Sequence, residues 1–334
     1  MATSLQDVIK RQGGIFARHQ AISAGCTPKE FRWLTRRSDG PWIRIRYGIY
    51  ANRNEWEALV PAQQVASLDR AALLVCDEGT VLSHSSAARA HKLPLYDVND
   101  GLAHVTRLRI HDRRLTRSVA GIKHHCGELA ADELTSVGGL PVTTVERTVL
   151  DVASEFGYRT GLVIADAALA RLVTRDQLTR AMPRFLHDSH ARTRSAVVAG
   201  ADGRAETPLE TLARILVKDM GIFDLEPQYK IRMADGAGVF VDLYSPRFHH
   251  CFECDGKLKY RQQVNLQGVS VSADDVVWDE KQREDKIRGA GFGVSRIVWR
   301  DTMPNAFGRA STRLWREILS QDAARMRSHT DQPA

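Results

Sequence analysis

The chain has 334 residues, a formal net charge of +7 and a sequence pI near 9.3. This length allows two or three domains with separate cores. The apolar share of 43% and the charged share of 26% are those of a globular protein and exclude a disordered one. The basic excess favours an anionic partner, and nucleic acid is the default expectation.

Several features place the protein in the cytoplasm as an expectation. No apolar run approaches the ~20 residues that a membrane-spanning helix needs, and the first residues lack the basic and apolar regions of a secretion signal. The five cysteines are odd in number and scattered, which fits free thiols in a reducing compartment. We therefore expect no membrane partner.

Residues 1–60 have the pattern of a winged helix-turn-helix. Residues 5–11 and 16–24 predict two short helices, and a capping box formed by Thr27 and Glu30 starts a third, which is expected to run to about residue 37. Apolar and basic residues then alternate over 42–50, as in a two-stranded wing. These 60 residues hold ten Lys or Arg and five Asp or Glu.

In such modules the third helix enters the major groove of DNA and the wing contacts the backbone. We expect Trp42, Tyr47 and Tyr50 to pin the wing. The alternative is a basic face that meets only water. The residues expected to contact double-stranded DNA are Thr27, Lys29, Arg32, Arg36, Arg37, Arg44 and Arg46. The arrangement resembles the N-terminal winged helix of AbiEi-type antitoxins from type IV toxin–antitoxin systems.

Residues 61–200 strengthen this resemblance. The strings SHSSAA at 83–88 with LPL at 93–95, HVT at 104–106 and GLPVTTVERTVLDVA at 139–153 look like the following domain of actinobacterial AbiEi-like proteins. The resemblance implies a mixed α/β antitoxin domain, with a cognate toxin or its operator as partner. Physically, Ser85 or Ser86 can cap one helix and Thr144 another, and Arg147 and Asp151 have the spacing of an i,i+4 ion pair.

Other interpretations of this region are weaker. Ser83, His84 and Asp151 could suggest a hydrolase, but adjacent Ser and His side chains on a strand point apart, and no glycine-rich nucleophile turn surrounds them. Residues 107–123 hold six Lys or Arg and one Asp, which indicates either a second nucleic-acid surface or a solvated strand edge. Residues 184–206 are basic and rich in small residues, and they predict a connector to the last domain.

The last third of the chain predicts a β-hairpin that carries carboxylates. Two β-rich runs, 240–244 and 248–255, flank a turn that contains Pro246. Glu253 and Asp255 share one face of the second strand, and Asp242 can point to that face from the first. Carboxylates gathered in this way repel one another unless a cation lies between them, and Mg²⁺ prefers oxygen ligands. Asp242 and Glu253 are the expected metal ligands.

The flanks of the hairpin extend the pattern. A helix opened by Thr207 and Glu210 precedes it, and a charged helix at 278–288 and a strand at 291–299 follow. Residues 204–320 therefore resemble the Vsr-type mismatch endonuclease fold of the PD-(D/E)xK superfamily. The resemblance implies Mg²⁺ and five catalytic residues, which would be Asp242, Glu253, Asp255, Glu210 and Lys257.

Two observations leave catalysis open. Asp255 stands where many superfamily members carry the catalytic Lys, so that Lys257, Lys259 or Lys286 would have to replace it. Glu210 also completes a capping box with Thr207, which stabilises a helix start without any catalysis.

Cysteine and histidine pairs suggest zinc only weakly. Cys251 and Cys254 follow His249 and His250, and Cys126 follows His124 and His125. Residues three apart on a strand point to opposite faces, so we expect Cys251 and Cys254 to be buried strand residues.

The sequence therefore predicts a multidomain α/β protein. Its parts are a winged helix-turn-helix at 1–60, a mixed α/β antitoxin domain at 61–200 and a restriction-endonuclease-like α/β/α domain at 204–320. The expected function is a DNA-binding antitoxin or transcriptional regulator with a nuclease-fold domain. The alternative is an active Mg²⁺-dependent DNA endonuclease, of nicking or mismatch type, targeted by the winged helix.

Overall fold

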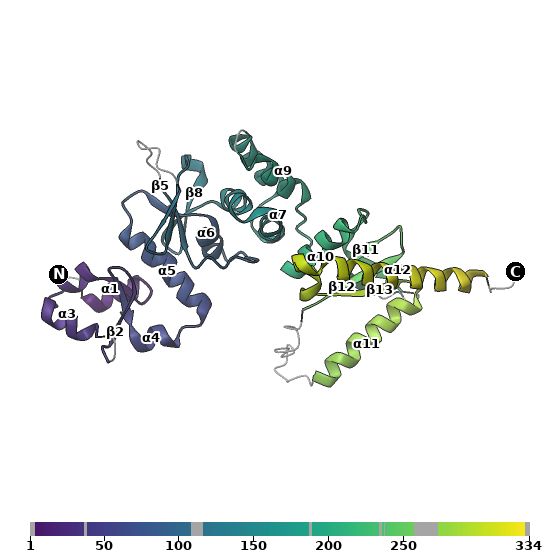
Figure 1. The fold of residues 1–334 in the computed structure, drawn as a ribbon, viewed down its shortest axis with the longest axis horizontal. Helices are drawn as coiled ribbons and strands as arrows, with labels where there is room; N and C mark the ends of the chain where they lie inside the picture. The colour runs from purple at the N-terminus through teal and green to yellow at the C-terminus, as the bar shows by residue number, and fades with distance from the viewer. Residues whose placement is uncertain are drawn as a thin grey trace. The chain divides into compact units, whose positions relative to one another are not determined.

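The computed structural model describes residues 4–36, 39–107, 116–186, 189–233, 236, 238–256 and 273–330. It is a mixed α/β protein with three sheets, shown in Figure 1. Contacts divide it into two units, Met1–Ala168 with Leu172–Ala201, and Leu169–Arg171 with Asp202–Ala334. Within the described ranges, no helix has the length and apolar character to cross a membrane.

Four helices and a small three-stranded sheet begin the first unit. The elements are α1 (Leu5–Arg11), β1 (Ile15–Ala17), α2 (Arg18–Ser23), α3 (Pro28–Leu34), β2 (Trp42–Arg46), β3 (Ile49–Asn52) and α4 (Arg53–Ala58). The second helix is shorter than expected, because buried Phe16 and its neighbours pair with β3 as a strand. The third ends at Leu34, since the chain then turns tightly and Gly40 N–H donates to Arg36 O at 3.1 Å.

Helix α5 (Pro61–Val75) belongs to two cores at once. Ala71 and Leu74 pack against the small sheet with Ile15 and Ile49. Ala72 and Leu73 on the same helix pack against the next sheet instead. The expected boundary at residue 60 therefore falls just before a helix that the two cores share.

A six-stranded sheet forms the middle of the first unit. Its strands are β4 (Thr80–Leu82), β5 (Ala103–Arg107), β6 (Arg117–Val119), β7 (Ile122–His125), β8 (Leu134–Val137) and β9 (Leu140–Thr143), and α6 (His84–Ala90) follows β4. The spatial order is β6-β7-β5-β4-β9-β8. The pairs β5–β7 and β4–β9 are parallel, and the other neighbours are antiparallel.

Helices complete the first unit: α7 (Val145–Arg171), α8 (Arg175–Ala181) and α9 (Ala191–Gly200), with a 3-10 turn at Met182–Phe185. Thr144 caps α7 as expected, through a hydrogen bond from Arg147 N–H. Gly157 breaks α7 into two halves with φ 81° and ψ −175°, a backbone region that is essentially restricted to glycine. Gly161 lies so close to Ala153 and Val197 that a Cβ there would come within 2.9 Å of both side chains.

The second unit has three layers. Helix α10 (Pro208–Asp219) precedes β10 (Glu226–Arg232), β11 (Gly238–Ser245) and β12 (His250–Asp255), and α11 (Ala273–Gly289), β13 (Gly293–Val298) and α12 (Phe307–Thr330) follow. The sheet order is β10-β11-β12-β13. The first three strands are antiparallel, and β13 runs parallel to β12.

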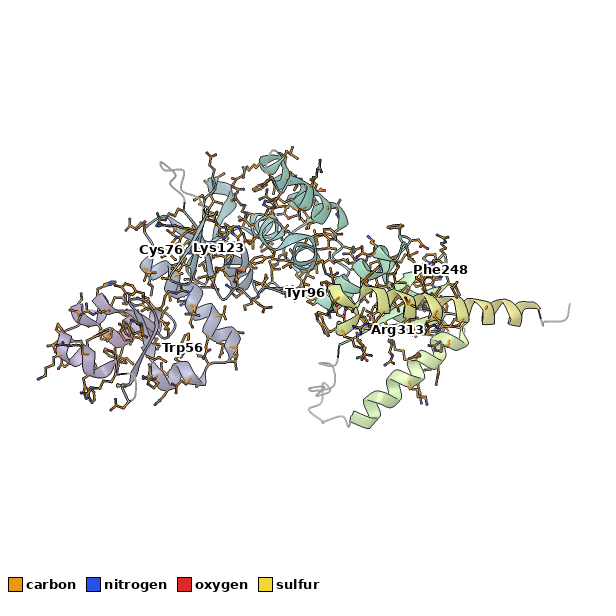
Figure 2. All side chains as sticks on the ribbon, in the orientation of Figure 1. Trp56, Cys76, Tyr96, Lys123, Phe248 and Arg313 are labelled. Atoms are coloured by element: carbon orange, nitrogen blue, oxygen red, sulfur yellow. The ribbon has the colours of Figure 1, made fainter. Side chains whose placement is uncertain are left out.

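The two faces of this sheet bury different helices (Figure 1). Leu209 of α10 and Leu314 of α12 pack on the face that carries Phe252 and Cys254. Ile287 of α11 packs on the opposite face, with Cys251. The expectation that the two cysteines are buried on opposite sides is confirmed. Arg313 of α12, labelled in Figure 2, bonds Asp301 Oδ2 at 2.9 Å and holds α12 against the chain after β13.

Candidate functional site

Helix α3 is anchored by one aromatic residue. Phe31 is buried with Phe16, and its ring lies 4.8 Å from that of Tyr50 in an edge-to-face contact. Thr27 and Glu30 form the expected capping box, in which Thr27 N–H donates to the Glu30 carboxylate at 2.8 Å and lowers the pKa of that group. The packing of Phe31 thus fixes one side of α3, and the capping box fixes its N-terminus.

Exposed basic groups lie on the side of α3 opposite Phe31, just after the helix and on β2. Lys29, Arg32 and Arg36 are exposed, as is Arg44 on β2. Among the described residues, no ion pair engages any of these four cations. Trp33, also on α3, is 57% exposed. Arg37 lies outside the described residues.

Two expectations about the β2–β3 hairpin are wrong. Arg46 is only 8% exposed and donates from Nη1 to Ala120 O at 2.8 Å, so it does not face solvent beside Arg44. The cause is a shift of register between Arg44 and Arg46, a β-bulge that turns the second arginine inward. Burial lowers the pKa of Arg46, and the nearby Asp69 opposes that shift. Tyr47 is 81% exposed and pins nothing in the hairpin, whereas Trp42 packs on Phe16.

In the second unit, the expected hairpin is confirmed as β11 and β12, paired from Leu243 with Phe252 to Ser245 with His250. Beyond this pairing, Asp242 accepts a hydrogen bond from Cys254 N–H at 2.7 Å. Asp242, Glu253 and Asp255 line one cavity of about 130 Å³. The structure therefore brings the three carboxylates together.

Arginines balance the charge of this cluster. Arg283 of α11 lies 3.0 Å from Glu253, and Arg296 of β13 lies 3.6 Å from Asp255. Arg296 also pairs with Glu284 at 3.1 Å. Guanidinium groups thus supply positive charge where the sequence led us to expect a metal ion. Such a mixture of acids and arginines differs from the all-oxygen surroundings that Mg²⁺ favours.

Glu210 adds a fourth carboxylate at the start of α10, where Thr207 is the N-cap and Glu210 bonds Glu206 N–H rather than the Thr207 N–H of the expected capping box. It is 4% exposed and accepts hydrogen bonds from Glu206 N–H, Thr207 Oγ1 and Gln228 Nε2 at 2.8, 2.9 and 3.0 Å. Burial raises the pKa of Glu210, and the charge of Asp242 raises it further. Of the three candidate lysines, Lys286 is exposed on α11, and Lys257 and Lys259 lie outside the described residues.

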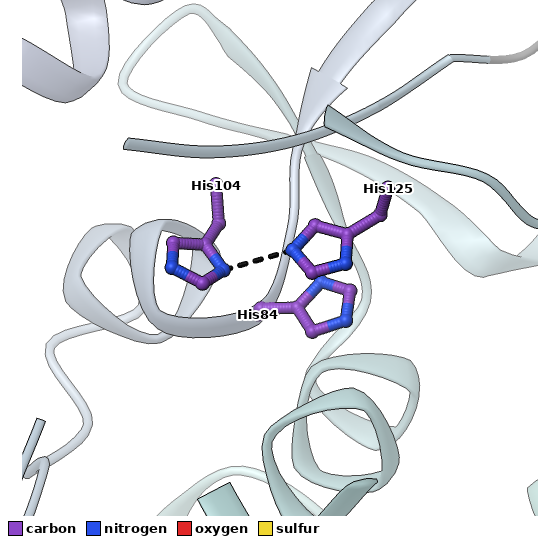
Figure 3. Close-up of side chains that lie close together, drawn as sticks. All are labelled: His84, His104 and His125. Atoms are coloured by element: carbon purple, nitrogen blue, oxygen red, sulfur yellow. Dashed lines mark hydrogen bonds between the residues drawn. The ribbon is translucent and has the colours of Figure 1, made fainter. Parts of the chain in front are cut away.

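A third cluster of functional side chains lies in the middle of the first unit, and the sequence did not predict it. His84 begins α6, His104 lies on β5 and His125 ends β7. Nδ1 of His104 is 2.9 Å from Nε2 of His125, and the ring of His84 stacks on that of His125 with centroids 3.5 Å apart. Figure 3 shows the three rings side by side. His84 has φ of 49°, uncommon for a residue other than glycine.

Polar groups hold the rings from outside the cluster. Asp100 Oδ2 lies 2.6 Å from Nε2 of His104, and Ser83 Oγ lies 2.9 Å from Nδ1 of His84. Burial lowers the pKa of all three histidines, for His84 and His125 well below the usual value. The imidazoles are therefore neutral at physiological pH.

His84 and His125 open onto a cavity of about 580 Å³. On its wall Arg147 bonds Asp151 at 2.9 Å, which confirms the expected i,i+4 pair, and bonds Glu133 at 3.1 Å. Burial opposes the charge of Arg147, but the two carboxylates outweigh it and the pKa is raised. The guanidinium groups of Arg147 and Arg194 make cation–π contacts with the ring of Phe185, and each central carbon lies within 5 Å of the ring centroid.

The geometry does not form a hydrolase triad. Ser83 lies at the N-cap of α6 and not on a strand, so the expectation that its hydroxyl points away from His84 is wrong. Asp151 Oδ2, however, is 4.0 Å from the same Nδ1 atom that Ser83 approaches. A triad needs the serine and the carboxylate at opposite ring nitrogens.

The expected caps of α6 are wrong as well, because Ser85 and Ser86 lie inside this helix. Ser86 Oγ donates to Asp69 at 2.6 Å and accepts from His104 N–H at 2.7 Å. Ser86 therefore fixes the backbone of one cluster histidine.

No protein-family model matches this chain, and a search of curated proteins finds no match to it.

Proposed function

We propose that the protein is a DNA-binding transcriptional regulator of the antitoxin type, similar to AbiEi proteins, with α3 as recognition helix and the β2–β3 hairpin as wing. One observation carries this proposal. Lys29, Arg32 and Arg36 are exposed on or just after a helix whose inner side is fixed by Phe31, and no ion pair among the described residues neutralises them. Unpaired cations on a rigid helix suit both groove and phosphate contacts.

The hairpin supports the same surface. Arg44 is exposed on β2, and Tyr47 is exposed at the turn between the two strands. In winged modules this element contacts the DNA backbone, where a single arginine adds affinity without sequence preference. Such a regulator would bind the operator of a cognate toxin gene.

Binding to DNA from upstream of the protein's own gene tests the proposal. Arg32→Ala/Arg36→Ala should weaken specific binding, since each lost base contact costs about 1–3 kcal/mol of discrimination. The matched control is Arg171→Ala/Arg180→Ala, which removes two exposed arginines from α7 and α8. Equal affinity of the first double variant and the parent would refute α3 as recognition helix.

A second candidate function is Mg²⁺-dependent DNA cleavage by the second unit. The order of helix α10, hairpin β11–β12, helix α11 and strand β13 is the order on which the resemblance to PD-(D/E)xK nucleases rests. Asp242, Glu253 and Asp255 share a cavity, and Asp242 lies near enough to Glu210 to raise its pKa. The ion pairs of Arg283 and Arg296 favour the regulator over the enzyme.

Nicking of supercoiled plasmid separates the two functions. An active enzyme would need Mg²⁺ or Mn²⁺ and would lose cleavage in Glu253→Gln while DNA binding by residues 1–60 persists. We expect no cleavage by the parent under any of these conditions. Metal-dependent nicking that Glu253→Gln abolishes would establish the endonuclease instead.

A further inference from the structure

The three-histidine cluster has the chemistry of a transition-metal site. Neutral imidazole is a common ligand of zinc and of neighbouring first-row ions, whereas Mg²⁺ prefers oxygen. One ligand nitrogen from each of His84, His104 and His125 can be chosen so that all lie within 4.8 Å of one another. Two nitrogens on one tetrahedral zinc ion are roughly 3.3 Å apart, given Zn–N bonds of about 2.0–2.1 Å.

The surroundings of the cluster match those of metal-binding histidines. A ligand histidine usually donates its second N–H to a carboxylate or another oxygen, which fixes the tautomer and leaves the first nitrogen for the ion. Asp100 takes this role for His104, because a proton on Nε2 that Asp100 accepts leaves the lone pair on Nδ1. That lone pair points at Nε2 of His125, 2.9 Å away.

Two of the rings must tilt to share an ion. His84 and His125 are stacked with their planes only 13° apart, and each nitrogen lone pair lies in the plane of its own ring. Both rings border the 580 Å³ cavity, so there is space on that side into which a ring can turn. Asp151 also lines this cavity, and its Oδ2 lies 4.0 Å from Nδ1 of His84. An ion on the three histidines would therefore have its fourth position on the cavity side, as in zinc sites that keep one position for water or a ligand.

We propose that His84, His104 and His125 form a binding site for one Zn²⁺ ion, open on one side to the cavity of the first unit. Asp100 is a positioning residue that acts through His104. The site is independent of DNA recognition, so either proposal can fail without the other.

Metal binding to the untagged, chelator-treated full-length protein tests the site. Competition of Zn²⁺ with a chromophoric chelator should give one ion per chain. His104→Asn or His125→Asn should weaken binding by more than about 100-fold, and Asp100→Ala, on a partly exposed loop, by about 10–100-fold. His124→Gln, next to His125 but outside the cluster, is the matched control and should bind as the parent does.

Spectroscopy of the parent protein covers the case in which a histidine variant does not fold. Co²⁺ in the site should give the visible bands of a tetrahedral or five-coordinate ion with nitrogen ligands and no thiolate charge-transfer band. A thiolate band that Cys126→Ser removes would place the ion on Cys126 and overturn the three-histidine site. Absence of stoichiometric Zn²⁺ binding, or binding that His125→Asn leaves intact, would overturn it equally.

Discussion

Arg283 and Glu253 are joined by two hydrogen bonds, Nη1 to Oε2 at 3.0 Å and Nη2 to Oε1 at 3.2 Å. This fork-to-fork contact occupies both oxygens of the carboxylate that the sequence proposes as a metal ligand. A divalent ion would have to displace a guanidinium group to bind Glu253.

Arg283→Gln should make the second unit sensitive to metal. The variant should lose roughly 1 kcal/mol or less of stability, because Arg283 is 38% exposed and water screens the pair. Millimolar Mg²⁺ or Mn²⁺ should then raise the melting temperature of the variant more than that of the parent. Lys281→Gln, an exposed change on the same helix, is the control. An equal rise in the melting temperature of the parent and of the variant on addition of Mg²⁺ would contradict this expectation.

The two arginines of β2 should have opposite effects. Arg46→Ala removes the partner of the Ala120 carbonyl oxygen and should destabilise the first unit by about 1–3 kcal/mol. Arg44→Ala should leave stability unchanged but lower affinity for all DNA sequences and reduce the salt slope by about 1. Urea unfolding and binding at several salt concentrations measure the two effects. If Arg44→Ala is less stable than Arg46→Ala, the structural role of Arg46 and the surface role of Arg44 are both wrong.

His250 should make the second unit sensitive to acid. Burial lowers the pKa of His250 to about 4, and the charge of Arg288 contributes, whereas the unfolded chain has an ordinary histidine near 6.5. The unfolded state therefore binds more protons between pH 6.5 and 4, and stability is lost as the pH falls through this window, by up to about 3 kcal/mol.

Urea unfolding of the full chain at pH 7, 5.5 and 4.5 should show this loss, and His250→Gln should reduce it. Gln can still reach Ser295, which lies 2.9 Å from Nε2 of His250. His19→Gln replaces an exposed histidine and should leave the pH dependence as in the parent. A slope that is identical in His250→Gln and the parent would show that other groups cause it.

Two glycines should respond in opposite directions to alanine. Gly157→Ala should cost about 1–3 kcal/mol through backbone strain alone, since φ is +81° and no atom lies within 4 Å of the added Cβ. Gly308 in α12 also has open space around the Cβ position but lacks a positive φ, so Gly308→Ala should stabilise by up to about 1 kcal/mol. Chemical denaturation of both variants tests the comparison. Equal effects would mean that α7 does not need its break at residue 157.

Features set by neighbouring residues could be predicted from the sequence. Thr27 and Glu30, three residues apart, form the capping box of α3, and two β-rich runs around a turn with Pro246 give the β11–β12 hairpin. Arg46 was misplaced, because one register shift reverses the side to which a strand residue points. The partner that Arg46 then reaches, Ala120 O, is 74 positions away along the chain.

The histidine cluster had no local signal of this kind. His104 and His125 meet because β5 and β7 pair in parallel, with Thr106 beside His125. His84 reaches them only through the turn from β4 into α6, where its backbone φ is positive. The three histidines come from three different elements, α6, β5 and β7, and their spacing along the chain resembles no metal motif.

Helix α5 ties residues 1–60 to the six-stranded sheet and its histidine cluster more closely than a linker would. Ala71 completes the core behind the small sheet, and its neighbour Ala72 completes the core under the six-stranded sheet. Unfolding of either core would expose one apolar side of α5 to water. Residues 1–201 should therefore unfold in one cooperative transition. A fragment that stops at residue 60 would lack α5 and so would leave the core behind the small sheet incomplete.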